Sequence, residues 1–239
     1  MKPTVDTADH WDQEAEAYTQ LRQPSQVDRR TLERVPPRGD VLELGAGPGV
    51  FTRQALAHPA RAGGGRFLVT DLAPAFLARL AALPVEVLAA DHRALALAVC
   101  SLDTAYAMAT LHHLAAPDRR ALLARLATWL RPQGRLALVE DWAFTPATEA
   151  EARLLALRRA LCAHDEAGEA HPGEATWRQH LEAAGLEITH REQVGRQEPL
   201  ARYRVLQDPV SRDQLAWLDA RGGPHEVPMT LLVAERPRP

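Results

Sequence analysis

An apolar run that ends in a cluster of glycines is the feature that most constrains the fold. Val41 to Leu44 leads directly into Gly45-Ala46-Gly47-Pro48-Gly49, and apolar residues at helical spacing begin at Val50. This order is typical of a buried strand, a tight turn and a helix whose first amides point at a bound group. Glycine adopts backbone angles that other residues avoid, and it lets a ligand lie against the main chain. The stretch therefore predicts a ligand-binding turn in an α/β protein.

The spacing of the glycines separates several kinds of nucleotide-binding turn. A dinucleotide fingerprint, G-x-G-x-x-G/A, needs a small residue at position 50, where this chain has Val50. A Walker-type phosphate loop needs a Gly-Lys pair, and the only lysine in the chain is Lys2. An NAD site is therefore disfavoured, and a Walker loop is excluded.

The pattern that remains, Glu-Leu-Gly-x-Gly-Pro-Gly from residue 43, resembles motif I of the class I S-adenosylmethionine-dependent methyltransferases. The resemblance is specific from about residue 41 to residue 140. It implies that the methionine part of the cofactor lies against the turn. The turn residues that it assigns to the cofactor are Glu43, Gly45, Ala46, Gly47 and Gly49.

Further cofactor residues are predicted after the next strands. Asp71 ends the apolar run from Arg66 and lies about as far beyond the glycines as a ribose-binding acid should. The resemblance implies that Asp71 accepts both ribose hydroxyls and that Asp91 holds the adenine amino group. Both acids could instead cap the helices that follow them. The same resemblance adds Tyr18, Leu72, His92, Met108 and His113 to the cofactor-binding set.

Residues 7 to 22 predict an amphipathic helix with Trp11, Ala15 and Tyr18 on one face. In small-molecule methyltransferases, a similar W-D-x-x-A-x-x-Y helix often lies over the cofactor. The resemblance therefore implies that residues 1–38 form an N-terminal helical lid. Aromatic residues at helical spacing are equally typical of simple core packing, so that alternative stays open.

Residues 145–175 interrupt the alternation of strands and helices. A helix from Pro146 to His164 is followed by a polar loop that ends near His171, and we interpret this insertion as a helical cap over the substrate. The loop contains residue types that bind metals, namely His164, Asp165, Glu166 and His171. Because the loop is acidic and its composition is that of a solvated segment, we predict no metal site.

His112 and His113 follow the fourth predicted strand and resemble the "lhHl" run of small-molecule methyltransferases. The Asn/Asp-Pro-Pro-aromatic motif of methyltransferases that act on nitrogens of DNA bases and protein glutamines is absent from this position. A sulfonium already carries an activated methyl group, so alignment should dominate the rate. We expect at most one general base, with His113 as the first choice and Asp141 as the second.

Seven predicted strands, with helices alternating through the first five, specify a doubly wound, mostly parallel α/β sheet in one domain of residues 1–239. The resemblance implies a Rossmann-like strand order of 3-2-1-4-5-7-6, with strand 7 antiparallel. Ligands in such sheets bind at the carboxyl ends of the strands. Motif I, Asp71, Asp91 and His113 are all predicted to lie at those ends.

The composition of the chain limits the kinds of molecule that it is expected to bind. The net charge is −3 and the acids and bases are interspersed, so no basic face for nucleic acid or anionic lipid is predicted. No apolar run approaches the roughly 20 residues that span a bilayer, and the first residues lack the apolar core of a signal peptide. We expect a cytoplasmic monomer or homodimer. Cys100 and Cys162 show no metal-ligand spacing, and we expect both to be buried.

The sequence therefore predicts methyl transfer from S-adenosylmethionine to a small-molecule acceptor, with S-adenosylhomocysteine as the product. A catalytically silent cofactor-binding regulatory domain is an alternative. An NAD-linked oxidoreductase is a further alternative, which Val50 disfavours.

Overall fold

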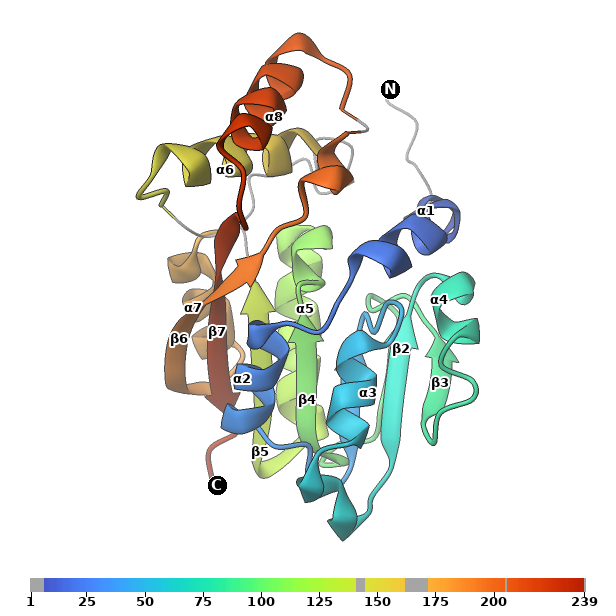
Figure 1. Ribbon diagram of the computed structural model, residues 1–239. Helices are drawn as coiled ribbons and strands as arrows, with labels where there is room; N and C mark the ends of the chain where they lie inside the picture. Colours follow the sequence, from blue (N-terminus) through green and yellow to red (C-terminus); the bar gives the residue numbers. More distant parts are fainter. Residues whose placement is uncertain (1–6, 141–144, 162–171, 205, 239) are drawn as a thin grey trace.

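A seven-stranded sheet forms the centre of the molecule (Figure 1). The computed structural model describes residues 7–140, 145–161, 172–204 and 206–238. The strand order is β3-β2-β1-β4-β5-β7-β6, and β7 runs antiparallel to both of its neighbours. The predicted α/β fold and strand order are thus confirmed. The strands are β1 (Val41–Leu44), β2 (Phe67–Asp71), β3 (Glu86–Ala89), β4 (Leu102–Met108), β5 (Leu130–Glu140), β6 (Glu187–Gln197) and β7 (Glu226–Glu235).

Helices cover both faces of the sheet and one of its ends. The described helices are α1 (Thr7–Leu21), α2 (Gln26–Arg34), α3 (Val50–Leu56), α4 (Pro74–Ala78), α5 (Ala116–Trp129), α6 (Glu149–Leu161), α7 (Glu174–Ala183) and α8 (Pro209–Arg221). The described ranges also contain the short 3₁₀ segments η1 (Pro59–Gly63), η2 (Leu111–His113) and η4 (Leu200–Tyr203). None of the helices in the described ranges is long and apolar enough to cross a membrane.

Strand β1 shows why the sheet has two apolar faces. Side chains alternate along a strand, so Leu42 and Leu44 pack with α5 and α7 on one face. Val41 packs with α2 and α3 on the other face, and the intervening Glu43 shares that side. A strand that is buried on both faces has to be apolar almost throughout, as the four-residue run from Val41 predicted.

The path of α1 is fixed at its carboxyl end by a buried acid. Ser25 caps α2, and the carboxylate of Asp28 accepts hydrogen bonds from the amide and the hydroxyl of Ser25. Arg22, just beyond α1, donates to both oxygens of Asp28 at 2.5 and 3.1 Å. Asp28 is fully buried. Because a buried charge needs such partners, this pair holds the connection between α1 and α2 in one geometry.

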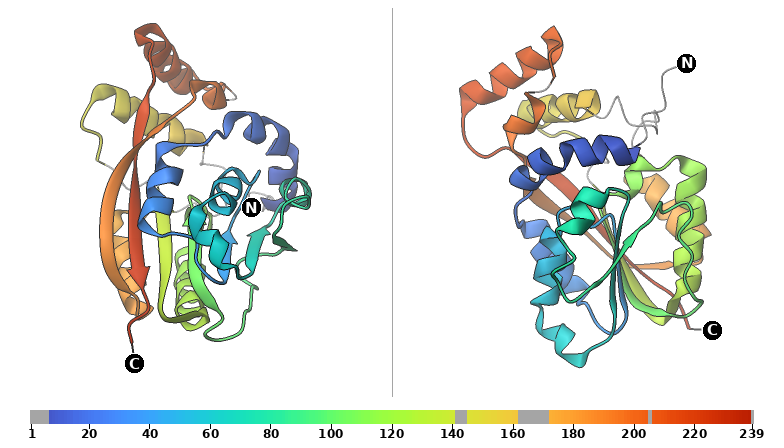
Figure 2. Two further views of the ribbon diagram at one scale, coloured as in Figure 1. Left: turned by 60° about the horizontal axis from the view of Figure 1, so that its bottom comes forward. Right: turned by 90° about the vertical axis from the view of Figure 1, so that its right-hand side faces the viewer.

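Helix α1 then crosses to α4 over the carboxyl ends of the strands (Figure 2). Ala15 packs with Ala73 and Phe76 in a small apolar cluster, against which Trp11 and Tyr18 also lie. The carboxylate of Asp12 accepts a hydrogen bond from the amide of Ala75 at 2.9 Å, at the start of α4.

Helix α6, segment η4 and helix α8 form a cap on the same end of the molecule as α1 (Figures 1 and 2). The cap has an apolar core of its own, which is separate from the two clusters on the sheet. The buried members of this core are Leu154, Leu155, Leu157, Tyr203, Leu218 and Val227. The cap that was predicted in residues 145–175 did not include η4 or α8.

Strand β5 continues through Pro132 and Gly134, although these residue types favour a turn. It does so because the ladder between β4 and β5 continues on both sides of them. Gln133 has a left-handed backbone with φ of +67°, and the register shifts between Leu102 and Thr104.

The expectation that Cys100 is buried is wrong. Cys100 is exposed, has φ of +54° and accepts a hydrogen bond at 3.3 Å from Arg236. It lies in the connection before β4 rather than in an apolar element, so its side chain reaches solvent. Cys162 lies outside the described residues.

Candidate active site

The three glycines of the turn after β1 have left-handed backbones, but for different reasons. A Cβ atom at Gly45 would overlap the side chain of Thr110, and one at Gly49 would overlap Leu80. A Cβ at Gly47 would meet only Cε1 of Tyr18, at an ordinary contact distance of 3.8 Å. Packing therefore requires glycine at 45 and 49, whereas Gly47 presents its bare backbone to open space. The open side of Gly47 is where a ligand could lie against the main chain.

Asp71 is bonded directly to this turn. Its Oδ2 accepts a hydrogen bond from the Gly47 amide at 2.8 Å, and its Oδ1 accepts one from the Ala73 amide at 3.0 Å. Burial raises the pKa of Asp71, while these amides and that of Leu72 oppose the rise. A carboxylate offers about four acceptor positions, so these three amides leave Asp71 with capacity for a further donor. Asp71 thus both caps the chain after β2 and supports the turn.

Aromatic side chains bring α1 over the turn. The Tyr18 ring packs edge-on against Phe76 of α4, with centroids 5.7 Å apart, and against Trp11 at the same distance. The Trp11 ring in turn lies edge-on to His113, at 5.4 Å. His113 is close enough to Asp71 to lower the pKa of that carboxyl. Helix α1, the glycine turn, Asp71 and His113 therefore surround one site at the carboxyl ends of β1, β2 and β4.

The end of β3 contributes the next two predicted residues. The carboxylate of Asp91 accepts hydrogen bonds from the amide and the side chain of Arg93. Burial alone would raise the pKa of Asp91, but the interactions with Arg93 outweigh it and lower that pKa. His92 lies with its Nε2 at 3.3 Å from the hydroxyl of Thr70. Burial lowers the pKa of His92 to about 4, so its ring is neutral. Asp91 keeps a partly exposed carboxylate, whereas His92 packs behind β2.

Two other predicted cofactor residues lie beneath the turn. Glu43 is buried, and its Oε2 accepts a hydrogen bond from the hydroxyl of Thr52 in α3 at 2.8 Å. Ala46 is buried and its amide donates to the carbonyl of Thr70. Both residues tie the turn to its neighbours rather than line its open side. Met108, at the end of β4, is half-buried against the core on the α2 and α3 face.

A buried pair beside His113 was not recognised in the sequence. Glu140, the last residue of β5, accepts a hydrogen bond from the Leu111 amide at 3.0 Å, and its Oε2 lies 2.7 Å from Nδ1 of His112. Burial raises the pKa of Glu140 to about 8, against the opposing effect of the amides and of Arg119. The rings of His112 and His113 are 4.0 Å apart. Glu140 therefore fixes the segment that presents His113 to the site.

An acid at the end of an otherwise apolar strand is the signal that could have identified Glu140, because such a residue needs a buried partner. The second predicted base, Asp141, lies outside the described residues. So do His164, Asp165, Glu166 and His171. Among the residues that are described, no group of three or more His, Cys, Asp or Glu side chains could hold a metal ion.

Residues 41–134 match the sequence profile of a family described as "Methyltransferase domain". This match begins at β1 and ends at Gly134, so it includes the glycine turn, Asp71, Asp91 and both histidines. No curated protein matches the chain in sequence.

Solved structures share the fold over almost the whole chain. The [4+2]-cyclase SpnF is 15% identical with a TM-score of 0.67, and the alignment covers 99% of this chain and 97% of that one. A protein in complex with the Haloferax volcanii Trm112 methyltransferase activator is 20% identical with a TM-score of 0.67, over 99% and 98% of the two chains. Haemonchus contortus phosphoethanolamine N-methyltransferase 2, in complex with S-adenosyl-L-methionine, is 15% identical with a TM-score of 0.68, over 99% and 61%. At these identities the likeness concerns the fold.

The buried Glu43 predicts a specific dependence of stability on pH. Burial raises its pKa from 4.5 to about 8, so the folded state favours the neutral acid. The stability that the neutral form provides is complete below the unfolded pKa and is lost as the pH rises through about 8. Glu43→Gln keeps an oxygen that can accept from Thr52 and has no proton to lose. We expect its melting temperature to match wild type near pH 4, to exceed it increasingly as the pH rises to about 8, and to exceed it by a constant amount above that pH.

Thermal unfolding followed by circular dichroism over this pH range measures the effect. Glu187→Gln, an exposed substitution in β6, serves as the control and should follow the wild-type profile. A difference between Glu43→Gln and wild type that is constant with pH would show that Glu43 does not titrate in this way.

Proposed function

We propose that this chain is a class I S-adenosylmethionine-dependent methyltransferase that methylates a small-molecule acceptor. The observation that carries the small-molecule assignment is the covering of the carboxyl ends of the strands. Helix α1 and the cap formed by α6, η4 and α8 both lie over this end (Figures 1 and 2). An acceptor that reaches Gly47 and His113 has to fit beneath these elements, which favours a metabolite over a macromolecular surface.

The charge of the chain supports the same class of acceptor. The net charge is −3, and nucleic acid binding depends largely on basic residues that contact phosphates. The solved relatives include an enzyme named for a small substrate, phosphoethanolamine N-methyltransferase 2. The proposal includes a cytoplasmic setting, with residues 1–38 as the lid and residues 145–175 as part of the cap.

For the cofactor, we propose that the methionine part lies along the open side of Gly47, beneath Tyr18. Asp71 has acceptor capacity left for the ribose hydroxyls, and Asp91 is the acid available for the adenine amino group. Leu72, His92 and Met108 would complete the walls, while Glu43, Gly45, Ala46 and Gly49 hold the turn in shape. The fit rests on Gly47, where the backbone is bare and packing does not require glycine.

When bound, the cofactor supplies a methyl group on a sulfonium, which leaves with both bonding electrons as S-adenosylhomocysteine. The protein has to align an acceptor lone pair with the methyl carbon and exclude water, and alignment can supply roughly 7–11 kcal/mol. Trp11 and Tyr18 would exclude water from one side. His113 is the proposed base that takes the proton of a hydroxyl acceptor, and Asp141 is the second candidate.

Release of S-adenosylhomocysteine in the presence of a metabolite library tests the proposed function. We expect turnover with at least one compound below about 1 kDa, and none with DNA, RNA or protein substrates. Binding of S-adenosylhomocysteine without turnover of any acceptor would favour a silent regulatory domain. Turnover of a compound without release of S-adenosylhomocysteine would favour a reaction of another kind. The [4+2]-cyclase SpnF, which shares this fold, is named for such a reaction.

Substitution at Gly47 tests the placement of the cofactor. Gly47→Ala has space for its Cβ, and its left-handed backbone should cost only about 1–2 kcal/mol of stability. The new methyl group would occupy the proposed path of the methionine part. We expect affinity for S-adenosylhomocysteine, measured by calorimetry on the folded variant, to fall by at least 10-fold.

Gly185→Ala is a matched control, because Gly185 also has a left-handed backbone with open space around it and lies far along the chain, after α7. It should bind S-adenosylhomocysteine like wild type. Affinity within a few-fold of wild type in Gly47→Ala would rule out this placement.

Substitution of His113 tests its role as the base. For a hydroxyl acceptor, His113→Ala should lower kcat by about 10²–10⁴ while S-adenosylhomocysteine binds within a few-fold of wild type. Added imidazole should restore part of kcat, because it replaces the missing base without replacing the packing against Trp11. His190→Ala, at the far edge of the sheet, is the control and should leave kcat unchanged. An unchanged kcat in His113→Ala would remove His113 from the mechanism.

A further inference from the structure

The first turn of α4 takes its side-chain cap from another helix. Ala73, the residue before α4, has no side-chain acceptor, and Pro74 has no amide proton. The Phe76 amide donates to the carbonyl of Ala73 at 3.2 Å. The Ala75 amide donates instead to Oδ1 of Asp12, at 2.9 Å and 63 residues away in the sequence. An acidic side chain that accepts from a first-turn amide is the usual cap of a helix, and here α1 supplies it.

The same short segment carries the acid that supports the glycine turn. Asp71 accepts from the Ala73 amide through Oδ1 and from the Gly47 amide through Oδ2. Asp12 and Asp71 therefore bind amides that lie on either side of Pro74. Hydrogen bonds run in this way from α1, through the start of α4, to the turn at Gly47. Helix α1 and the glycine turn are thus attached to one segment.

The other contacts between α1 and α4 are a small apolar cluster and an exposed ion pair. Ala15 is buried in the cluster around Phe76. Glu16 pairs with Arg79 at the far end of α4, but the two side chains are 70% and 37% exposed, and ion pairs as exposed as this contribute little. Because the carboxyl end of α1 is held by the buried Asp28, α1 leaves α4 by lifting its amino-terminal end. The bond from Ala75 to Asp12 opposes that movement.

An aromatic side chain of the proposed site depends on this attachment. Trp11 directly precedes Asp12, and its ring lies edge-on to both His113 and Tyr18. Tyr18 is the side chain nearest to the open side of Gly47. The views in Figures 1 and 2 show α1 crossing to α4 over the carboxyl ends of the strands. When the amino-terminal end of α1 leaves α4, Trp11 leaves both rings and the site opens on that side.

We propose that Asp12 is a positioning residue, whose bond to Ala75 keeps the amino-terminal end of α1 closed over the bound cofactor with Trp11 in place. The proposal rests on the proposed function, since it assigns the closure of the same cofactor site to one side chain. Helix α1 moves away from α4 to admit the cofactor, and the bond forms as α1 returns. A cofactor held by Asp71 stabilises the segment that also receives Asp12. Binding and closure therefore favour each other.

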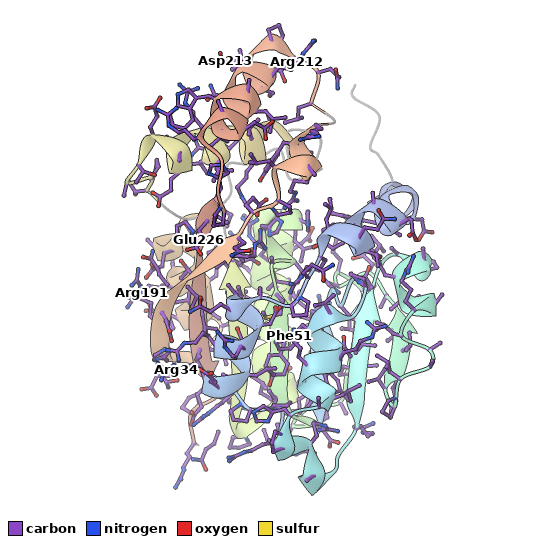
Figure 3. The ribbon with its side chains drawn as sticks, viewed as in Figure 1. Arg34, Phe51, Arg191, Arg212, Asp213 and Glu226 are labelled. Carbon is purple, nitrogen blue, oxygen red and sulfur yellow. The ribbon has the colours of Figure 1, made fainter. Side chains whose placement is uncertain are left out.

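The test compares three variants with wild type. Asp12→Ala removes the acceptor and should fold, because Asp12 is exposed and alanine favours helices. Asp12→Asn keeps an oxygen that accepts from Ala75 and removes only the charge. Asp208→Ala is the matched control, because Asp208 accepts from the Ser211 amide at 2.8 Å in the first turn of α8. Figure 3 shows Asp213 of the same helix at the far tip of the cap.

Release of S-adenosylhomocysteine is measured by surface plasmon resonance on the immobilised full chain, which gives kon and koff. Loss of a capping side chain shifts an equilibrium by roughly 3- to 30-fold, so koff should rise by that factor in Asp12→Ala. The value of kon should not fall, because the open form admits the ligand. Asp12→Asn and Asp208→Ala should keep koff within about 2-fold of wild type. An unchanged koff or a lower kon in Asp12→Ala, or an equal rise of koff in Asp12→Asn, would overturn the proposal.

The position of α1 is measured separately, by hydrogen–deuterium exchange in saturating S-adenosylhomocysteine. An isolated helix as short as α1 is marginal in water, so its amides exchange when it leaves α4. The exchange rate of a segment that opens locally follows its open population. In Asp12→Ala, exchange in the amino-terminal half of α1 should rise by the same factor as koff, while exchange in α5 stays unchanged. A faster koff without faster exchange in α1, or faster exchange in α5 as well, would overturn the proposal.

Binding of S-adenosylhomocysteine to wild type separates failure of this proposal from failure of the proposed function. Wild type that does not bind S-adenosylhomocysteine refutes the proposed function. Wild type that binds it, with a koff and an exchange of α1 that Asp12→Ala leaves unchanged, refutes only the role of Asp12. A rise in koff that accompanies faster exchange in α1, and that Asp12→Asn does not share, assigns the closure of the site to the bond at Ala75.

Discussion

The hydrogen bond from the Gly47 amide to the carboxylate of Asp71 is the interaction on which the site depends. It joins the turn after β1 to the end of β2, and the Ala46 amide adds a second link through the carbonyl of Thr70. A left-handed turn with three glycines loses much conformational entropy on folding, so it needs such partners to hold one shape. Because the acceptor is a buried carboxylate, the bonds that it accepts are strong ones. The turn is therefore held in shape by the protein before any ligand arrives.

Most of the fold could be predicted from the sequence, because local patterns determine it. The strand from Val41 to Leu44 was predicted to the residue, since a short apolar run before a glycine cluster is typical of a buried strand. The glycine turn located the carboxyl ends of the strands, and Asp71, Asp91 and His113 were predicted there from their places after successive strands. Boundaries were less predictable where pairing overrides propensity, as in β5, which continues through a turn.

The features that were missed depend on contacts between distant segments. Glu140 and His112 are 28 residues apart, and their pairing follows from the adjacency of β4 and β5. Glu198 in the cap pairs with arginines from α6, β6 and η4, which share no sequence pattern. Equally, the three glycines of motif I look alike in the sequence, but Gly45 and Gly49 are required by Thr110 and Leu80, and only Gly47 is bare. Such a distinction between glycines can be made only from the side chains that surround each of them in the folded protein.

The attachment of α1 has a kinetic consequence. Its carboxyl end is fixed through Arg22 and the buried Asp28, whereas its other end rests on a small cluster around Ala15 and Phe76. Segments with few buried contacts open at a lower free energy than the core of the same protein. Helix α1 is thus firmly attached at its carboxyl end and weakly held at its amino-terminal end. Trp11, which contacts His113, lies toward the weakly held end. Because Trp11 packs against both His113 and Phe76, opening of the amino-terminal end of α1 breaks both ring contacts at once.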